Sequence, residues 1–187
     1  LNLVNQQTAD AVEAQELPWD IQPWRGVWRD LSERFLQRCE AYSWFDPVHR
    51  CPRILFPCWQ QQSLVGWVAR RLDKNDEKKY LNAPGMKSQN IWFPFDTMAR
   101  LLPQTLERTR TVVLVEGPAD ALRLMAYKIP ALAILGTNNF RDYNYVQLVT
   151  KRVKRVILAL DSDKSGKKAR QEIAPVLAEW FNGEHFY

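Results

Sequence analysis

Val156-Ile157-Leu158-Ala159-Leu160-Asp161-Ser162-Asp163 is an apolar run that ends in two carboxylates. An earlier stretch, Val112-Val113-Leu114-Val115-Glu116-Gly117, has the same form with one carboxylate. Short, uninterrupted apolar runs are typical of strands that are buried on both faces of a parallel sheet. Ligands bind beyond the carboxyl ends of such strands, so we expect Glu116, Asp161 and Asp163 to converge. Three adjacent carboxylates repel one another unless a cation lies between them, and oxygen ligands favour magnesium or manganese.

The sequence around these two runs alternates predicted strands with predicted helices. A third strand is expected over 131–135, and helices are expected after Gly117-Pro118, over 144–151 and from Ser165 onward. The residues expected to face the sheet are Leu122, Met125 and Ala126 in the first helix, and Ala169, Ile173, Leu177 and Trp180 in the last. This alternation predicts βαβ units and a parallel sheet.

The first half of the chain has a different pattern. Residues 1–23 are polar and then interrupted by proline, which predicts a loosely held segment. Apolar residues at three-and-four spacing from Val27 to Cys39 predict an amphipathic helix. Two strand-like runs, 53–59 and 63–70, predict a hairpin that turns at 60–62, and a short helix is expected over 96–102. We therefore expect a smaller α+β subdomain over 24–107, followed by an α/β domain over 108–187.

Composition limits the class of partner. Lys and Arg number 26 against 21 Asp and Glu, which gives a net charge of +5 and favours a polyanionic partner. The three cysteines form no Cys-x-x-Cys pair, so neither a disulfide framework nor a zinc ribbon is expected. No run approaches the roughly 20 apolar residues that a membrane span needs. These features predict a protein of a reducing compartment, with no membrane partner.

Three motifs in the second half are together specific. Glu116-Gly117-x-x-Asp120, Leu135-Gly136-Thr137 and Asp161-x-Asp163-x-x-Gly166 resemble the Toprim domain shared by DnaG-type primases, topoisomerases of types IA and II, and some nucleases. The resemblance implies that Glu116, Asp161 and Asp163 bind a divalent metal, Mg²⁺ with Mn²⁺ as the second choice. Asp120 matches a further acidic position of the primase version. That version has another acidic pair on its next strand, so the domain is expected to be truncated at its carboxyl end.

Four basic residues follow the acidic pair: Lys164, Lys167, Lys168 and Arg170. Their role is open between two interpretations. Lys164 and Lys167 lie at the start of the last predicted helix, where they would contact phosphate or partly balance the carboxylates. Alternatively they are part of a solvated helix face, which is the commoner use of a charge run. For the carboxylates, the alternative is a surface turn after a strand. We favour a metal site over such a turn, because three carboxylates occur at matching strand ends. A cation held there would suit phosphoryl transfer, which requires one beside the reacting phosphate.

The first half also resembles one branch of this group. Arg25-Gly26-Val27, Asp46-Pro47, 54–57, 65–70 and 79–84 occur in the order of the amino-terminal half of a primase RNA polymerase domain of the phage type. The resemblance implies that three residues bind nucleotide or template: Arg70, Lys79 and Asn82. Arginine binds phosphate through two parallel hydrogen bonds, which suits this role. We expect Tyr80 and Leu81 to be packing residues rather than base-stacking ones.

These observations lead us to expect the catalytic core of a DNA primase. Such an enzyme makes RNA primers from ribonucleoside triphosphates on single-stranded DNA, with a replicative helicase or another replisome protein as partner. It acts in the cytoplasm, that of a bacterial host if it is phage-encoded. Two alternatives remain: a Toprim nuclease that uses the same metal to cleave, and a non-catalytic nucleic-acid-binding module.

Overall fold

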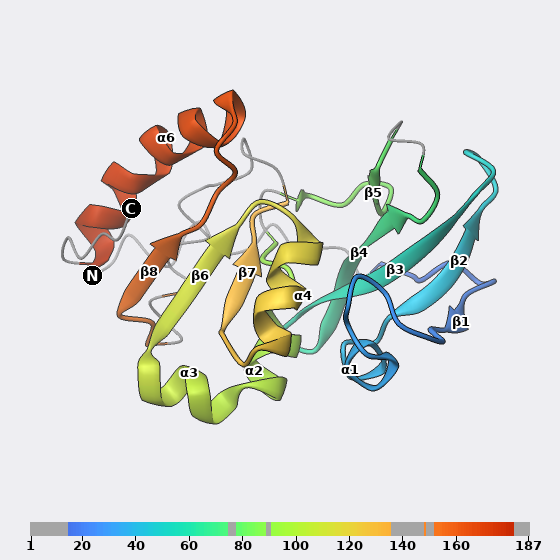
Figure 1. Cartoon of the computed structure of the whole chain (residues 1–187), viewed down its shortest axis with the longest axis horizontal. Coiled ribbons are helices and arrows are strands. Elements are labelled where there is room, and N and C mark those ends of the chain that lie inside the picture. Colours follow the sequence, from blue (N-terminus) through green and yellow to red (C-terminus); the bar gives the residue numbers. More distant parts are fainter. Residues whose placement is uncertain (1–14, 75–77, 89–90, 136–147, 149–151, 182–187) are drawn as a thin grey trace.

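The fold consists of two sheets, seen in a computed structural model that describes residues 15–74, 78–88, 91–135, 148 and 152–181 (Figure 1). The first sheet is antiparallel, with the strand order β1-β2-β3-β4-β5. Its strands are β1 (Gln22–Pro23), β2 (Tyr42–Asp46), β3 (Cys51–Gln60), β4 (Ser63–Arg71) and β5 (Tyr80–Asn82). The second sheet is parallel, with the order β7-β6-β8. Its strands are β6 (Thr111–Val115), β7 (Ala131–Ala133) and β8 (Arg155–Leu158).

Five helices are described around these sheets. They are α1 (Glu33–Arg38), α2 (Phe95–Leu101), α3 (Pro103–Thr109), α4 (Pro118–Ala126) and α6 (Lys164–Phe181). In Figure 1, α4 lies beside β7, and α6 runs along the β8 side of the parallel sheet. Within the described residues, no helix is long and apolar enough to cross a membrane.

The parallel sheet confirms the expected α/β architecture. The central strand β6 is buried along Val112–Val115, as a strand covered on both faces must be. In α4, Leu122 and Met125 are buried as expected, but Ala126 is exposed and Ala121 takes the inward position instead. Ala169, Ile173 and Leu177 of α6 are also buried as expected. The side chain of Trp180 and most of the helix predicted over 144–151 lie outside the described residues.

The first half departs from the expected helix over 27–39. The helix α1 begins only at Glu33, with the Ser32 side chain accepting a hydrogen bond from the Phe35 N–H as its cap. Arg29 and Asp30 have φ values of 49° and 65°, and this left-handed backbone cannot belong to a right-handed helix. The expected inward position of Val27 is wrong, because its side chain is 70% exposed.

Two further segments contain structure that the sequence patterns do not predict. In the segment expected to be loosely held, Gln22 and Pro23 pair with β2, and the Gln15 N–H donates to the Leu64 carbonyl at 3.0 Å. The connection before Thr111 contains α3, which begins with Pro103 in its first turn. Proline suits that position because its missing N–H would have no partner there.

One hydrophobic core joins the two sheets. Phe56 and Val68 of the antiparallel sheet pack in the same cluster as Val113 and Ala133 of the parallel sheet. Phe93 lies between them, with its ring 5.8 Å from that of Phe56 and its backbone bridged to Ala133. Because the sheets share this core, β4 and β5 are held in a fixed position relative to the end of β6.

The predicted hairpin is confirmed, with β3 and β4 closing at the pair Gln60 and Ser63. The two turn residues, Gln61 and Gln62, have φ values of 51° and 68°. Two successive left-handed residues suit the right-handed twist of the strands, but glutamine is a poor choice there compared with Asn-Gly.

This turn generates a stability prediction. We expect Gln61→Asn combined with Gln62→Gly to raise the free energy of unfolding by about 1 kcal/mol, because both new residues adopt positive φ readily. Urea denaturation measures the change. Gln62→Val is the matched control and should lower stability, since a β-branched residue is strained at positive φ. Equal stability of the two variants would contradict the assigned turn.

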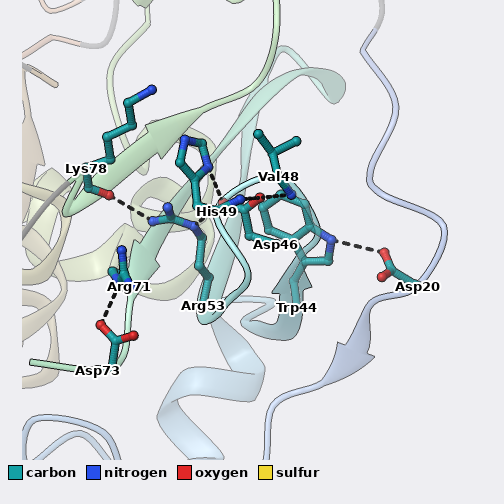
Figure 2. A network of polar contacts seen from close by, with 9 residues as sticks. All are labelled: Asp20, Trp44, Asp46, Val48, His49, Arg53, Arg71, Asp73 and Lys78. Carbon is teal, nitrogen blue, oxygen red and sulfur yellow. Dashed lines mark hydrogen bonds and ion pairs between the residues drawn. The ribbon is translucent and has the colours of Figure 1, made fainter. Parts of the chain in front are cut away.

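A buried ion pair lies at the end of the antiparallel sheet (Figure 2). Asp46 and Arg53 are both 0% exposed, and Arg53 Nε donates to Asp46 Oδ2 at 2.8 Å. Burial by itself raises the pKa of the Asp46 carboxyl. Hydrogen bonds from Arg53, His49 and Val48 outweigh that effect and hold the pKa below its ordinary value of 3.8.

The ion pair predicts a pH-dependent loss of stability. We expect Asp46→Asn to lower the free energy of unfolding by about 3–5 kcal/mol, because it leaves Arg53 buried without a counter-charge. The depressed pKa means that the carboxylate's contribution is complete above the unfolded-state pKa and is lost as pH falls through the folded-state pKa. The difference from the unmodified chain should therefore shrink below about pH 4 in urea titrations. A difference that grows on acidification would contradict the assignment.

Candidate active site

A pocket of about 440 Å³ opens where the parallel strands end and β4 and β5 pass beside them. One wall carries the carboxylates of Glu116, Asp120 and Asp161, and the other carries Arg70 and Lys79. Tyr80, Leu81, Asn82, Gly117, Pro118 and Leu135 complete the lining. Its volume is in the range of small-molecule sites. The fold therefore brings acidic residues from the second half of the chain opposite basic residues from the first.

Glu116 is the centre of the acidic wall. It directly follows β6, is half-buried, and accepts a hydrogen bond at Oε1 from the Asp161 backbone N–H at 3.1 Å. Burial raises the pKa of the Glu116 carboxyl, the Asp161 N–H lowers it, and the charges of Asp161, Asp163 and Asp120 raise it again. The net direction is upward, with burial as the largest cause and repulsion from the three neighbouring carboxylates adding to it.

Gly166 packs directly against Glu116. A Cβ atom at this position would lie 2.5 Å from Glu116 Oε1 and would also clash with the Asp161 carbonyl. The Gly166 N–H donates to Asp163 Oδ1 at 2.8 Å, so Asp163 is the side-chain cap of α6. The Asp161-to-Gly166 loop thus folds tightly over the Glu116 carboxylate because residue 166 has no side chain.

The basic wall is built by the pairing of β4 with β5. Arg70 lies opposite Tyr80 in this pair, and Arg70 Nη1 donates to the Tyr80 hydroxyl at 2.5 Å. The Arg70 guanidinium also lies 4.9 Å from the centroid of the Tyr80 ring. These contacts with the hydroxyl and the ring of Tyr80 restrict the Arg70 guanidinium at the pocket wall. Lys79, the residue before Tyr80, is exposed.

The structure brings six predicted site residues together in the pocket and leaves three outside it. The six are Arg70, Lys79, Asn82, Glu116, Asp120 and Asp161. The other three, Asp163, Lys164 and Lys167, are exposed at the start of α6 and do not line the pocket. Gly136 and Thr137 of the third motif lie outside the described residues.

The expected convergence of Glu116, Asp161 and Asp163 on one point is not seen. Among the residues that the structure describes, no three His, Cys, Asp or Glu side chains are arranged to hold a metal ion. The physical reason is local, since one oxygen of Asp163 caps α6 and Glu116 Oε1 accepts the Asp161 N–H. The candidate ligands are still of the chemical type that a hard cation prefers, because all of them are carboxylates.

Sequence reasoning missed the role of Tyr80, which it placed in the core. Tyr80 is half-buried, lines the pocket and orients Arg70. A signal was available in the alternation of strand residues, because Tyr80 and Asn82 lie two apart and therefore share a face of β5. Leu135, which belongs to the third motif but was given no role, also lines the pocket.

The comparisons with known proteins agree with this geometry. A family described as Toprim-like matches residues 113–183. This part of the chain is a Toprim domain. The match covers most of β6 and all of α4, β7, β8 and α6, together with the acidic wall of the pocket. The basic wall, carried by β4 and β5, lies outside the matched residues.

Similar proteins extend over both halves of the chain. It is 31% identical over 122 residues to the DNA primase of Legionella pneumophila, which covers 63% of this chain and 20% of that protein. It is 27% identical over 163 residues to the DNA primase of Aquifex aeolicus, which covers 84% of this chain and 28% of that protein. The chain thus spans less than a third of the length of either relative.

A solved structure shows the same fold. The primase fragment of the bacteriophage T7 primase-helicase protein matches 89% of this chain and 64% of that one, with a TM-score of 0.62 and 18% identity. At this identity the likeness concerns the fold alone. It includes the antiparallel half, because the matched residues of the Toprim domain make up less than half of the chain.

The contact between Gly166 and Glu116 predicts that Gly166→Ala lowers stability, which is the opposite of the usual effect of Gly→Ala in a helix. Gly→Ala in an exposed helix stabilises by up to about 1 kcal/mol. We expect Gly166→Ala to destabilise the Toprim domain by about 1–3 kcal/mol instead, because the added methyl displaces the Glu116 carboxylate or the Asp161 carbonyl. Urea denaturation measures it, with Lys168→Ala on the exposed face of α6 as the control. Stabilisation by Gly166→Ala would show that the loop does not pack on Glu116.

Proposed function

We propose that this chain is the catalytic core of a DNA primase, a nucleotidyltransferase that joins ribonucleoside triphosphates into short RNA primers on a single-stranded DNA template. The observation that carries the proposal is the pocket, in which Arg70 and Lys79 lie opposite Glu116, Asp120 and Asp161. Nucleotidyl transfer needs both walls, since positively charged side chains must hold the triphosphate while carboxylates hold a metal ion beside it. Similarity to proteins named DNA primase supports the same choice.

The proposed roles divide between two parts of the chain. Residues 24–107 supply the nucleotide and template wall, with Arg70 and Lys79 on phosphate and Asn82 on a base or sugar. Residues 108–187 supply the acidic wall as a Toprim domain. Lys164 and Lys167, at the exposed start of α6, contact the nucleic acid outside the pocket.

The acidic wall is proposed to hold Mg²⁺, with Mn²⁺ as a substitute, through Glu116, Asp161 and Asp163. The cation when bound neutralises charge on the phosphate oxygens and activates the attacking hydroxyl. Asp163 uses one carboxylate oxygen as the cap of α6, which leaves the other for a cation. Asp120 adds negative charge one helical turn from Glu116, and its Oδ2 lies close to Gly117 at the pocket wall.

The setting of this activity is also a proposal. A phage-type or bacterial replication system would place the chain in the bacterial cytoplasm, beside a replicative helicase or another replisome protein. The net charge of +5 fits a template of single-stranded DNA, because it attracts a polyanion at a distance.

The test is template-directed synthesis of a dinucleotide from ribonucleoside triphosphates in the presence of Mg²⁺. We expect Glu116→Gln and Asp161→Asn each to lower the rate at least about a hundredfold, because each removes a charged metal ligand. Arg70→Met should raise the KM for nucleotide more than it lowers kcat. Glu107→Gln, on the exposed face of α3, is the control and should keep the unmodified rate. A normal rate in Glu116→Gln would contradict the proposed site.

The same assay separates the two alternatives. A Toprim nuclease would cut the template in Mg²⁺ and would not extend ribonucleotides, and the same acidic variants would abolish cutting. A non-catalytic module would bind single-stranded DNA without either reaction. We favour the primase over both because the basic wall of β4 and β5 faces the acidic one across a pocket of nucleotide size.

A further inference from the structure

The wall of the pocket that carries Lys79, Tyr80 and Asn82 is a weak structural element by itself. The strand β5 has three residues and lies at the edge of the antiparallel sheet, where β4 is its only partner among the strands that the structure describes. A three-residue edge strand is held by few backbone hydrogen bonds, so its position depends on contacts at its ends. At the far end the Ala83 N–H donates to the Trp67 carbonyl at 2.9 Å, and at the end that precedes Lys79 a buried side chain takes part.

That contact is made by Arg53 (Figure 2). Arg53 Nη1 donates to the backbone carbonyl of Lys78 at 3.1 Å, and the Arg71 N–H donates to the next carbonyl, that of Lys79, at 3.0 Å. Lys78 has a φ of 48°, in the left-handed region that is unfavourable for a residue with a side chain. Strained backbone of this kind persists only where neighbouring groups fix it. The Arg53 guanidinium is the side chain that fixes the carbonyl of Lys78.

Asp46 in turn fixes Arg53. Its Oδ2 accepts from Arg53 Nε at 2.8 Å and contacts His49 Nδ1 at 2.7 Å, and its Oδ1 accepts the N–H groups of Val48 and His49. Both members of the ion pair are 0% exposed. The carboxylate is therefore held by the turn after β2, and it sets the direction in which the guanidinium points.

This ion pair is a poor device for stability alone. Its burial removes two charges from water, and within the described residues Arg53 Nη2 is buried without a hydrogen-bond partner. Pairs of this kind are often replaced by apolar residues of similar size without loss of stability. An apolar replacement would fill the space but would offer no donor to the Lys78 carbonyl.

We propose that Arg53, oriented by Asp46, is a positioning residue for the nucleotide-binding wall. It sets the backbone at Lys78 and through it the placement of Lys79 and Tyr80, and Tyr80 orients Arg70. Arg53 does not line the pocket, so it acts through these residues and not on substrate. The proposal rests on the proposed function of the pocket.

The test compares three variants of the 187-residue chain: Arg53→Met, the pair Asp46→Leu with Arg53→Met, and Asp20→Asn. The single variant leaves Asp46 buried without its counter-charge and should unfold more readily. The pair should restore the midpoint of thermal unfolding, since no buried charge remains. Asp20→Asn is the matched control, because it alters a hydrogen bond to Trp44 at the same end of the sheet without touching Lys78.

Two readouts separate positioning from a merely structural role. In dinucleotide synthesis with ATP and Mg²⁺, the pair should raise the KM for ATP about tenfold, as expected for losing a hydrogen bond from a charged donor, with kcat changed less. In hydrogen–deuterium exchange, the N–H groups of residues 79–82 should exchange about tenfold faster. A stable pair with unmodified KM and exchange would overturn the proposal, because a purely structural role predicts recovery of all three properties together.

A fallback variant and a fallback measurement cover the two ways in which this test could fail to give an answer. If the paired variant does not fold, Arg53→Lys keeps a charge beside Asp46 but lacks the fork that reaches the Lys78 carbonyl, so the same rise in KM is expected. An unmodified KM in Arg53→Lys would then overturn the proposal. If the unmodified chain makes no dinucleotide, the proposed function fails, and the exchange of residues 79–82 still decides whether Arg53 holds this wall.

Discussion

The hydrogen bond from the Asp161 backbone N–H to the Glu116 carboxylate is the contact on which the rest of the site depends. It joins the segments that follow β6 and β8, and Gly166 packs against it at a position where no side chain fits. The contact places Asp161 beside the Glu116 carboxylate at the end of the parallel sheet. The Asp161 N–H lowers the pKa of Glu116, but burial and the charges of Asp161, Asp163 and Asp120 outweigh it and keep that pKa raised. A cation is the natural partner of such a wall.

The second constraint is the shared core of the two sheets. Because Phe56 and Phe93 pack between the antiparallel and parallel halves, the basic wall of β4 and β5 stands at a fixed distance from the acidic one. Neither half forms the pocket alone. Arg70 comes from a strand whose register against β5 sets its contact with Tyr80, while Glu116 comes from a strand whose end is set by the parallel sheet. The chemistry proposed here is thus a property of the interface between the halves.

The parts of this arrangement that could be predicted from the sequence are those with a local signature. The buried strands and their terminal carboxylates follow from apolar runs, and the hairpin of β3 and β4 follows from two runs separated by a short turn. The start of α1 could not be predicted, because the left-handed backbone at Arg29 and Asp30 overrides apolar spacing that continues through them. Asp163 illustrates a different difficulty, since aspartate serves equally well as a metal ligand and as a helix cap. The role of Arg53 could not be predicted, because it depends on the carbonyl of Lys78, which is 25 residues away in the sequence.

The measurement that tests the account most directly is a crystal structure of this chain with Mn²⁺ and a ribonucleoside triphosphate. The account predicts an anomalous peak for manganese within about 2.5 Å of oxygens of both Glu116 and Asp161, with the triphosphate reaching from the metal to Arg70 and Lys79. A metal bound away from Glu116, or a triphosphate that contacts neither basic residue, would contradict the claim that the two walls form one nucleotidyl-transfer site.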